Sequence, residues 1–414
     1  MGHRPSRQRI EALSVIAMLA VLGATAQAIE LHVPGIEAAS LHGYYKNFFL
    51  ALDSSDPLVK SGQEDLNRGR LMLEGQLTKS SDFAVHYEHL LTIHPLNDTG
   101  IFLGTAGGGR KPGIWPLSWS LGNYGSVRWR HEIDRLFVRR RAEWGDVTVG
   151  RQAIGWGAGL VWSPEDLFVA FSPVEIDREF RAGVDAARVL VSLGPFTEAE
   201  AVYAVFGNGV DNHAAAVRWR TTLAGPGVDV GLMAGKFYQD AVGGGLLSGE
   251  VYGVGVHGEA TATHAFRGDR TRVGAQDFVR AVAGADYRFP GEVRVVGEYY
   301  FNGFGTSDPR RYLDLAASPR LARGEIFNLG RHYLGFIADW EAHPLLHLGA
   351  QGEWNLQDPS AFVGPTFTLS LSDNAQLDGG AYFALGAERS SDLTLGSEFG
   401  SAPNLFYAAG KVYF

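Results

Sequence analysis

The feature that most constrains this chain of 414 residues is a recurrent alternation of apolar and polar side chains. In the segment 68–78, for example, Leu71 and Leu73 alternate with Arg70 and Glu74. A β-strand places successive side chains on opposite faces, so this pattern gives each strand one apolar and one polar face. Beyond its N-terminus the chain has no run of the ~18 consecutive apolar residues that a transmembrane helix needs. The pattern therefore predicts an all-β protein.

The N-terminus has the three parts of an export signal. The first nine residues contain three arginines, and residues 12–24 form an uncharged apolar core. Ala26-Gln27-Ala28 then supplies a small-x-small cleavage pattern. We expect a secretory signal peptide that is removed after Ala28.

The composition excludes several classes of function. The chain contains no cysteine, which rules out disulfides, thiolate metal sites, iron–sulfur clusters and covalently attached haem. Its formal net charge of −9 argues against binding of nucleic acid. We expect neither a cofactor nor a metal ion.

An export signal together with alternating strands favours a closed β-barrel in a membrane. A closed barrel pairs the backbone N–H and C=O groups of its strands in lipid, and its strands need apolar side chains only on alternate residues. We expect one transmembrane antiparallel β-barrel in the outer membrane of a Gram-negative bacterium. The predicted organisation is a signal peptide (1–28), a short periplasmic segment (29–39) and the barrel (40–414).

The connections between the predicted strands alternate between short and long, as in outer-membrane barrels. Placing all tight turns at the periplasmic side requires an extra hairpin between residues 244 and 266. The count is then eighteen strands, with sixteen as the fallback. Tight turns are predicted at 79–82, 143–146, 193–196, 224–227, 289–292, 342–344 and 372–375, and long extracellular loops at 52–65, 95–123, 155–182, 305–326 and 388–403.

A soluble, secreted β-sandwich or β-helix would show the same alternation with its apolar face turned inward. The position of the aromatic residues favours the barrel, because they gather near the predicted strand ends as interfacial girdles do. The tryptophans of this group are Trp129, Trp144, Trp219, Trp340 and Trp354.

The chain ends in LFYAAGKVYF, an alternating strand whose last residue is Phe414. This end resembles the C-terminal signal of bacterial outer-membrane β-barrels. The resemblance implies recognition of Phe414 by the barrel assembly machinery.

The long segment 155–182 contains too many apolar and aromatic side chains for a loop in water. We expect it to fold inward and to narrow the lumen, its acidic residues facing arginines on the lumen side of the strands. The field between them would then select small polar or charged solutes. The acidic residues are Glu165, Asp166, Glu175, Asp177 and Glu179, and the arginines are Arg68, Arg70, Arg135, Arg139, Arg141, Arg188, Arg218 and Arg220.

An equally open alternative is that these arginines pair with carboxylates of the wall and only satisfy a wet interior. The wall carboxylates available for this are Glu74, Glu88, Glu198 and Glu200.

The run Gly150-Arg151-Gln152, followed by Trp156-Gly157 and later by Gly183-Val184-Asp185, is similar to the same region of alginate-export-type and related porin-like barrels. This resemblance covers residues 135–190. It implies the architecture and leaves the solute open.

These observations bear on three classes of function. We expect a porin-like channel for passive diffusion of small hydrophilic or charged solutes, with lipid around it and a homotrimer as one possible assembly. The alternative is a barrel sheath that holds a periplasmic or multihaem electron-transfer partner across the membrane. An enzyme is not expected, because no G-x-S-x-G or H-E-x-x-H motif occurs. His86 and His94 lie too far apart along one strand to share a metal ion.

Overall fold

The computed structural model describes residues 28–94, 96, 113–177, 179–207, 209–223, 225, 227–266, 276–390 and 394–414. Residues 1–27, and with them the predicted signal peptide, lie outside these ranges. In the described part of the chain twenty strands form one antiparallel sheet. They are β1 (Ile29–Leu31), β2 (Ala38–Asp53), β3 (Gly62–Thr78), β4 (Ser81–Ile93), β5 (Ser118–Tyr124), β6 (Val127–Ala142), β7 (Gly145–Gln152), β8 (Val184–Gly194), β9 (Thr197–Val205), β10 (Ala214–Leu223), β11 (Val228–Phe237), β12 (Asp240–Val251), β13 (Val254–Ala265), β14 (Phe278–Phe289), β15 (Val293–Asn302), β16 (His332–His343), β17 (Leu346–Asn355), β18 (Ser360–Ser372), β19 (Ala375–Leu385) and β20 (Asn404–Tyr413).

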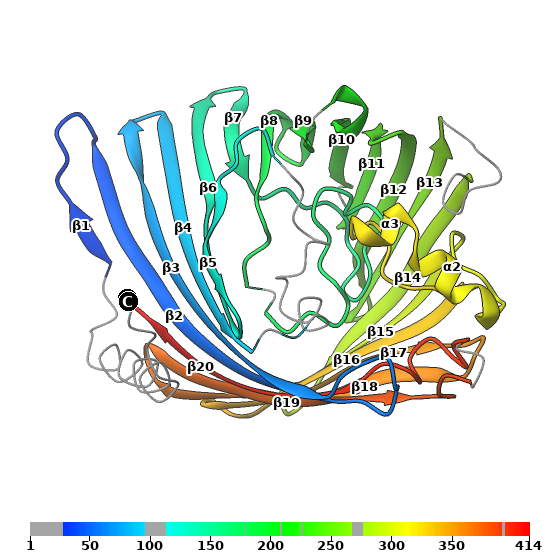
Figure 1. Cartoon of the computed structure of the whole chain (residues 1–414). Helices are drawn as coiled ribbons and strands as arrows, with labels where there is room; N and C mark the ends of the chain where they lie inside the picture. The colour runs from blue at the N-terminus through cyan, green and yellow to red at the C-terminus, as the bar shows by residue number, and fades with distance from the viewer. Residues whose placement is uncertain are drawn as a thin grey trace, which may run out of the picture.

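The sheet closes on itself, because β2 pairs with β3 along one edge and with β20 along the other (Figure 1). Strands β1 and β5 add short pairings to β2 and β6 and do not belong to the ring. The ring therefore contains eighteen strands, as the sequence predicted, and the fallback of sixteen is wrong. The extra hairpin predicted between 244 and 266 is β12 and β13.

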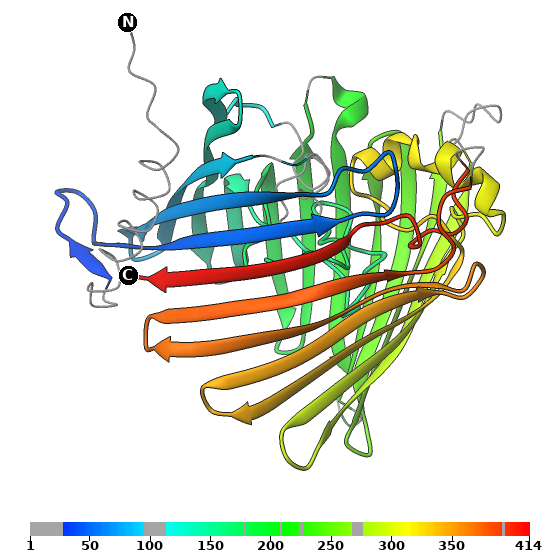
Figure 2. The ribbon, with the colours of Figure 1, turned by 60° about the horizontal axis from the view of Figure 1, so that its bottom comes forward.

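The two ends of the barrel differ in their connections (Figure 2). At one end, the short-turn end, β3–β4, β6–β7, β16–β17 and β18–β19 are each joined by two residues, and the C-terminus lies there too. At the other end, the long-loop end, most strands are joined by longer segments, although β11 and β12 are joined by two residues there. These include 54–61, 153–183, 303–331 and 386–403.

Burial is inverted relative to a water-soluble protein. Apolar side chains on the outer face are open, with Val149 57% and Leu232 59% exposed. Charged side chains on the inner face are covered, with Lys46 0% and Arg70 2% exposed. The five tryptophans predicted for the girdles are all among the exposed residues. A barrel with an apolar outside and a polar inside follows from the alternating pattern, with the apolar face turned outward.

Strand β7 is short and pairs with only one half of β6, the half near the short-turn end. Strand β5 pairs with the other half of β6, where β7 has already ended. Arg151 near the end of β7 fixes this junction: its Nε donates to Asp185 of β8 at 2.6 Å, and it also donates to the carbonyl of Trp115, just before β5. At the end of β7 the chain therefore leaves the barrel wall partway between the two ends, before it reaches the long-loop end.

The short helices lie in the connections at the long-loop end. In the segment 303–331, Asp308 and Ser318 cap two of them by accepting a hydrogen bond from the amide two residues later. None of the helices in the described residues is long and apolar enough to cross a membrane. The helices are η2 (Val210–Asn212), η3 (Pro309–Arg311), α2 (Tyr312–Ala316) and α3 (Pro319–Ala322).

Candidate functional site: the loop inside the barrel

The connection 153–183 between β7 and β8, called the inward loop below, runs through the interior of the barrel (Figure 1). The sequence predicted this from the number of apolar residues in 155–182. Trp156, Trp162 and Phe168 of the loop are 4%, 5% and 0% exposed, so its aromatic side chains are packed rather than hydrated. The inward loop therefore occupies part of the barrel interior.

The first part of the inward loop is fixed by apolar packing against β8–β12. Trp156 meets Phe168 edge-to-face at 5.0 Å between ring centroids, and Phe168 meets Phe237 of β11 at 5.2 Å. Ile154 and Leu167 belong to the same buried cluster. Burying aromatic side chains of this size favours the inward position by roughly 1.5–3 kcal/mol each.

Two carboxylates of the opposite wall bind the backbone of the loop between residues 158 and 165. Glu259 of β13 accepts hydrogen bonds from the amides of Ala158 at 2.5 Å and Glu165 at 3.2 Å, and from the intervening amide of residue 159. Glu298 of β15 accepts from the amides of residues 160, 161 and 162 at 2.5, 3.0 and 3.1 Å. Each wall carboxylate thus satisfies three backbone donors that would otherwise be buried without partners.

Glu165 is the buried acid of this part of the loop. Its side chain is 1% exposed, and neither carboxyl oxygen has a hydrogen-bond partner in the described part of the chain. Burial, and then the charge of Glu259, raise the pKa of Glu165 to about 8. Glu165 is therefore mostly protonated at neutral pH.

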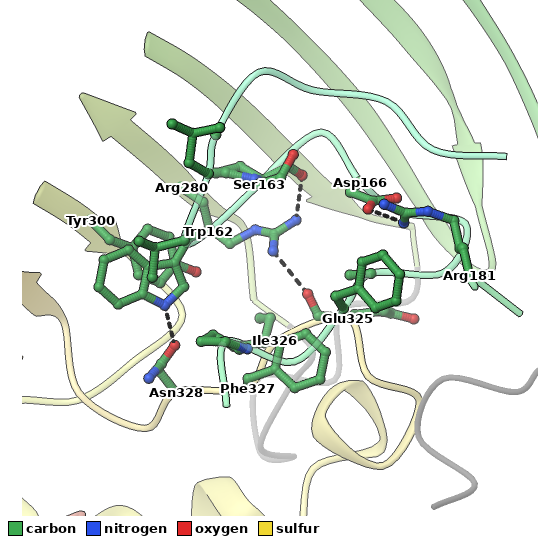
Figure 3. A pocket seen from close by; sticks show the side chains of 17 residues that line it. Trp162, Ser163, Asp166, Arg181, Arg280, Tyr300, Glu325, Ile326, Phe327 and Asn328 are labelled. Carbon is green, nitrogen blue, oxygen red and sulfur yellow. Dashed lines mark hydrogen bonds and ion pairs between the residues drawn. The ribbon is translucent and has the colours of Figure 1, made fainter. Parts of the chain in front are cut away.

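A cavity of ≈ 100 Å³ lies beside this part of the loop, between the loop, β14, β15 and residues 325–328 (Figure 3). Arg280 of β14 crosses it and donates to the carbonyls of Pro164 and Glu325, at 2.8 Å each. Trp162 stacks on Tyr300, and its Nε1 donates to Asn328 at 2.9 Å. The cavity has aromatic walls, and its charged groups already have protein partners.

The returning part of the loop is held by ion pairs. Asp177 binds Arg68 of β3 at 2.8 Å and Lys46 of β2 at 3.4 Å, and Lys46 also binds Glu179. Burial alone would raise the pKa of Asp177, but the charges of Arg68 and Lys46 outweigh it and hold this pKa below its ordinary value. Phe180 stacks on Tyr44 of β2 with centroids 5.5 Å apart.

The predicted arginines do not form a row that faces the acidic loop. Of the eight, Arg68 alone has a described ion pair with a carboxylate of the inward loop. The others pair with carboxylates of the wall, which is the alternative that the sequence left open. Arg70 pairs with Glu88 and Asp134, Arg135 with Asp134, Arg188 with Glu200, Arg218 with Glu198 and Glu200, Arg220 with Glu198, and Arg139 and Arg141 with Asp82.

The predicted acidic residues are also divided. Asp177 and Glu179 meet wall cations, whereas Asp166 pairs with Arg181 of the loop itself. Glu175 accepts a hydrogen bond from the amide of Ser172 at 3.2 Å. Glu74, expected as an arginine partner, binds His86 at 2.7 Å. Among the described residues no cluster of histidine and carboxylate side chains could hold a metal ion.

Three residues that hold the loop were not among the predicted ones: Lys46, Glu259 and Glu298. Each lies at an inward position of its strand, so the alternation could have placed the three in the lumen. Nothing in the sequence distinguishes them from the other inward polar residues, because their partners are 94–138 residues away along the chain.

Comparisons with known proteins agree with the fold. No protein-family description and no characterised relative matches the sequence, so the resemblance to alginate-export-type barrels stays a prediction. Solved structures share the architecture, among them the following three. OccAB1 of Acinetobacter baumannii has a TM-score of 0.58 and 9% identity over 94% of this chain and 99% of that one. OccAB4 of the same organism has 0.57 and 8% over 92% and 100%, and OccD3 (OpdP) of Pseudomonas aeruginosa has 0.56 and 10% over 94% and 93%.

Proposed function

We propose that this protein is a porin-like channel of the outer membrane through which small hydrophilic or charged solutes diffuse passively. One observation carries the proposal: a barrel with apolar side chains outside and charged side chains inside is narrowed by a loop packed into its lumen. The apolar exterior suits lipid, and the charged interior suits water. Solved barrels with the same architecture support the fold on which this rests.

The finer part of the proposal concerns the narrowest point. Asp177 and Glu179 of the inward loop lie against Arg68 and Lys46 of the wall, so opposite charges meet where the loop crosses. Low-dielectric walls around a narrow passage concentrate such a field. The field orders water and favours polar or charged solutes over apolar ones.

The sheath for an electron-transfer partner is the weaker candidate. A sheath needs an unoccupied bore, whereas here the inward loop reaches the opposite wall at Glu259 and Glu298. In the proposed setting residues 1–28 direct export, and the strand that ends in Phe414 is presented to the assembly machinery.

The experiment is single-channel conductance of the purified protein in planar lipid bilayers. We expect discrete, stable conductance steps and a clear increase when residues 158–179 are replaced by a short Gly-Ser linker. A matched control shortens the connection 303–331 instead. Protein that inserts and folds in the bilayer but carries no current would overturn the proposal.

A further inference from the structure

Glu165 and Glu259 form an acid pair at the point where the inward loop meets β13. The amide of Glu165 donates to the carboxylate of Glu259 at 3.2 Å, so the two residues are in direct contact. Both side chains are buried, at 1% and 4% exposure. Two carboxyl groups in one buried site cannot both ionise without a large penalty.

The two carboxyl groups are supplied unequally with hydrogen-bond donors. Glu259 accepts three backbone amides of the loop, which favour its charged form. Neither oxygen of Glu165 has a donor among the described residues. The negative charge therefore belongs on Glu259, and the proton of the pair belongs on Glu165.

The surrounding charges do not neutralise an ionised Glu165. Arg218 of β10 is bound at 2.7 Å to Glu200, and its guanidinium lies over the ring of Trp156. Arg280 of β14 is occupied by two backbone carbonyls. The remaining neighbours are also paired with each other: Asp166 with Arg181 in the loop, and His257 of β13 with Glu298 of β15.

We infer that the inward loop is a pH-sensitive constriction, closed while Glu165 carries a proton and released from β13 when that proton is lost. The effect on transport rests on the proposed channel function, whereas the pH-dependent release of the loop from β13 does not. Ionised Glu165 would place a second negative charge beside Glu259, and Arg218, the cation that acts on Glu165, is already paired with Glu200. The loop escapes this repulsion by moving residues 158–165 away from the wall.

The direction with pH follows from the raised pKa. An exposed Glu165 would ionise near pH 4.5, whereas the buried group does so near pH 8. Between these values the closed loop binds more protons than the released loop. The closed state therefore loses stability as pH rises from about 4.5 to 8, and above pH 8 this loss has reached its full size.

Two measurements test this on the full-length protein. The natural chain has no cysteine, so a spin label on Ala170→Cys in the loop reports its mobility without background labels. We expect label mobility and single-channel conductance to rise together between pH 6 and 9.5, with conductance at least doubling. Glu165→Gln keeps the shape of the side chain but cannot ionise. In this variant the spin label should stay immobile and the conductance should stay low throughout this range.

Glu259→Gln serves as the second variant, because removing the charge that binds the loop amides should loosen the loop at every pH. Glu250→Gln, an exposed acid near the short-turn end, is the control and should titrate like the wild type. An unchanged pH transition in Glu165→Gln, or no transition in the wild type, overturns the inference. A normal mobility transition without any current would instead overturn the proposed channel function.

Discussion

The inward loop is attached to the barrel at two places by opposite arrangements of charge. Between residues 158 and 165 the wall supplies the carboxylates, Glu259 and Glu298, and the loop supplies backbone amides, joined at Glu259 by the side chain of Ser163. Between residues 177 and 179 the loop supplies the carboxylates and the wall supplies the cations Lys46 and Arg68. We call these the amide attachment and the ion-pair attachment.

The difference determines how each attachment depends on sequence. Any residue except proline has a backbone amide, so the amide attachment constrains the wall far more than the side chains of the loop. The ion-pair attachment needs particular side chains on both partners. Substitutions in the loop should therefore affect the second attachment, and substitutions in β13 and β15 the first.

The largest effect is expected for Glu298→Ala. It leaves three loop amides and His257 without their partner, at roughly 1–3 kcal/mol for each unsatisfied donor. Hydrogen exchange of the amides of residues 160–162 should accelerate by more than a hundredfold. Glu250→Ala is the control, and equal protection in both variants would contradict the amide attachment.

A smaller loss is expected for Asp177→Asn in the ion-pair attachment. Removing one partner of a buried pair costs about 3 kcal/mol, and here Arg68 keeps Glu88 nearby as a second partner. Exchange should accelerate around residue 177 while residues 160–162 stay protected. Acceleration at both places would show that the two attachments act as one unit.

Glu398 offers a test of the same chemistry between two loops. Its carboxyl accepts the amide of Leu329 and the side chain of Asn355, both at 2.7 Å. Burial raises the pKa of Glu398 to about 7, so this contact should weaken as pH rises from about 4.5 to 7. Exchange of the Leu329 amide, corrected for its intrinsic pH dependence, should follow this course. In Glu398→Gln the pH dependence should disappear.

The smallest effect is expected for Arg139→Ala and Arg141→Ala. Both side chains are nearly half exposed and pair with Asp82 beside the short β3–β4 turn, far from either attachment. Exposed pairs contribute about 0–1 kcal/mol. Ion selectivity should stay close to that of the wild type, and a reversal of selectivity would place the constriction at this end of the barrel instead.

Much of the wall could be predicted from the sequence because its rules are local. Alternation places Arg70 inward and Leu71 outward without knowledge of any partner, and the short connections identify one end of the barrel. Strand β5 was not predicted, because it fills the place left by a short β7 and its alternation of Trp119 and Leu121 with serines is too short to distinguish it from a loop.

The two attachments could not be predicted, because their partners lie far apart along the chain. Lys46 and Asp177 are 131 positions apart, and the amides of Leu160 and its neighbours carry no side-chain signal for Glu298. The sequence placed Asp177 and Arg68 in the same lumen but gave no means of choosing this pair among the many possible ones.

Glu179 contacts Lys46 on β2 and the hydroxyl of Tyr413 on β20, the strands where the first and last parts of the ring meet. The inward loop therefore bridges β2 and β20, the two strands whose pairing closes the barrel. Pairing of β2 with β20 brings Lys46 and Tyr413 to one place, and Glu179 contacts both there. The position of the returning part of the loop thus depends on the strand pair that closes the cylinder.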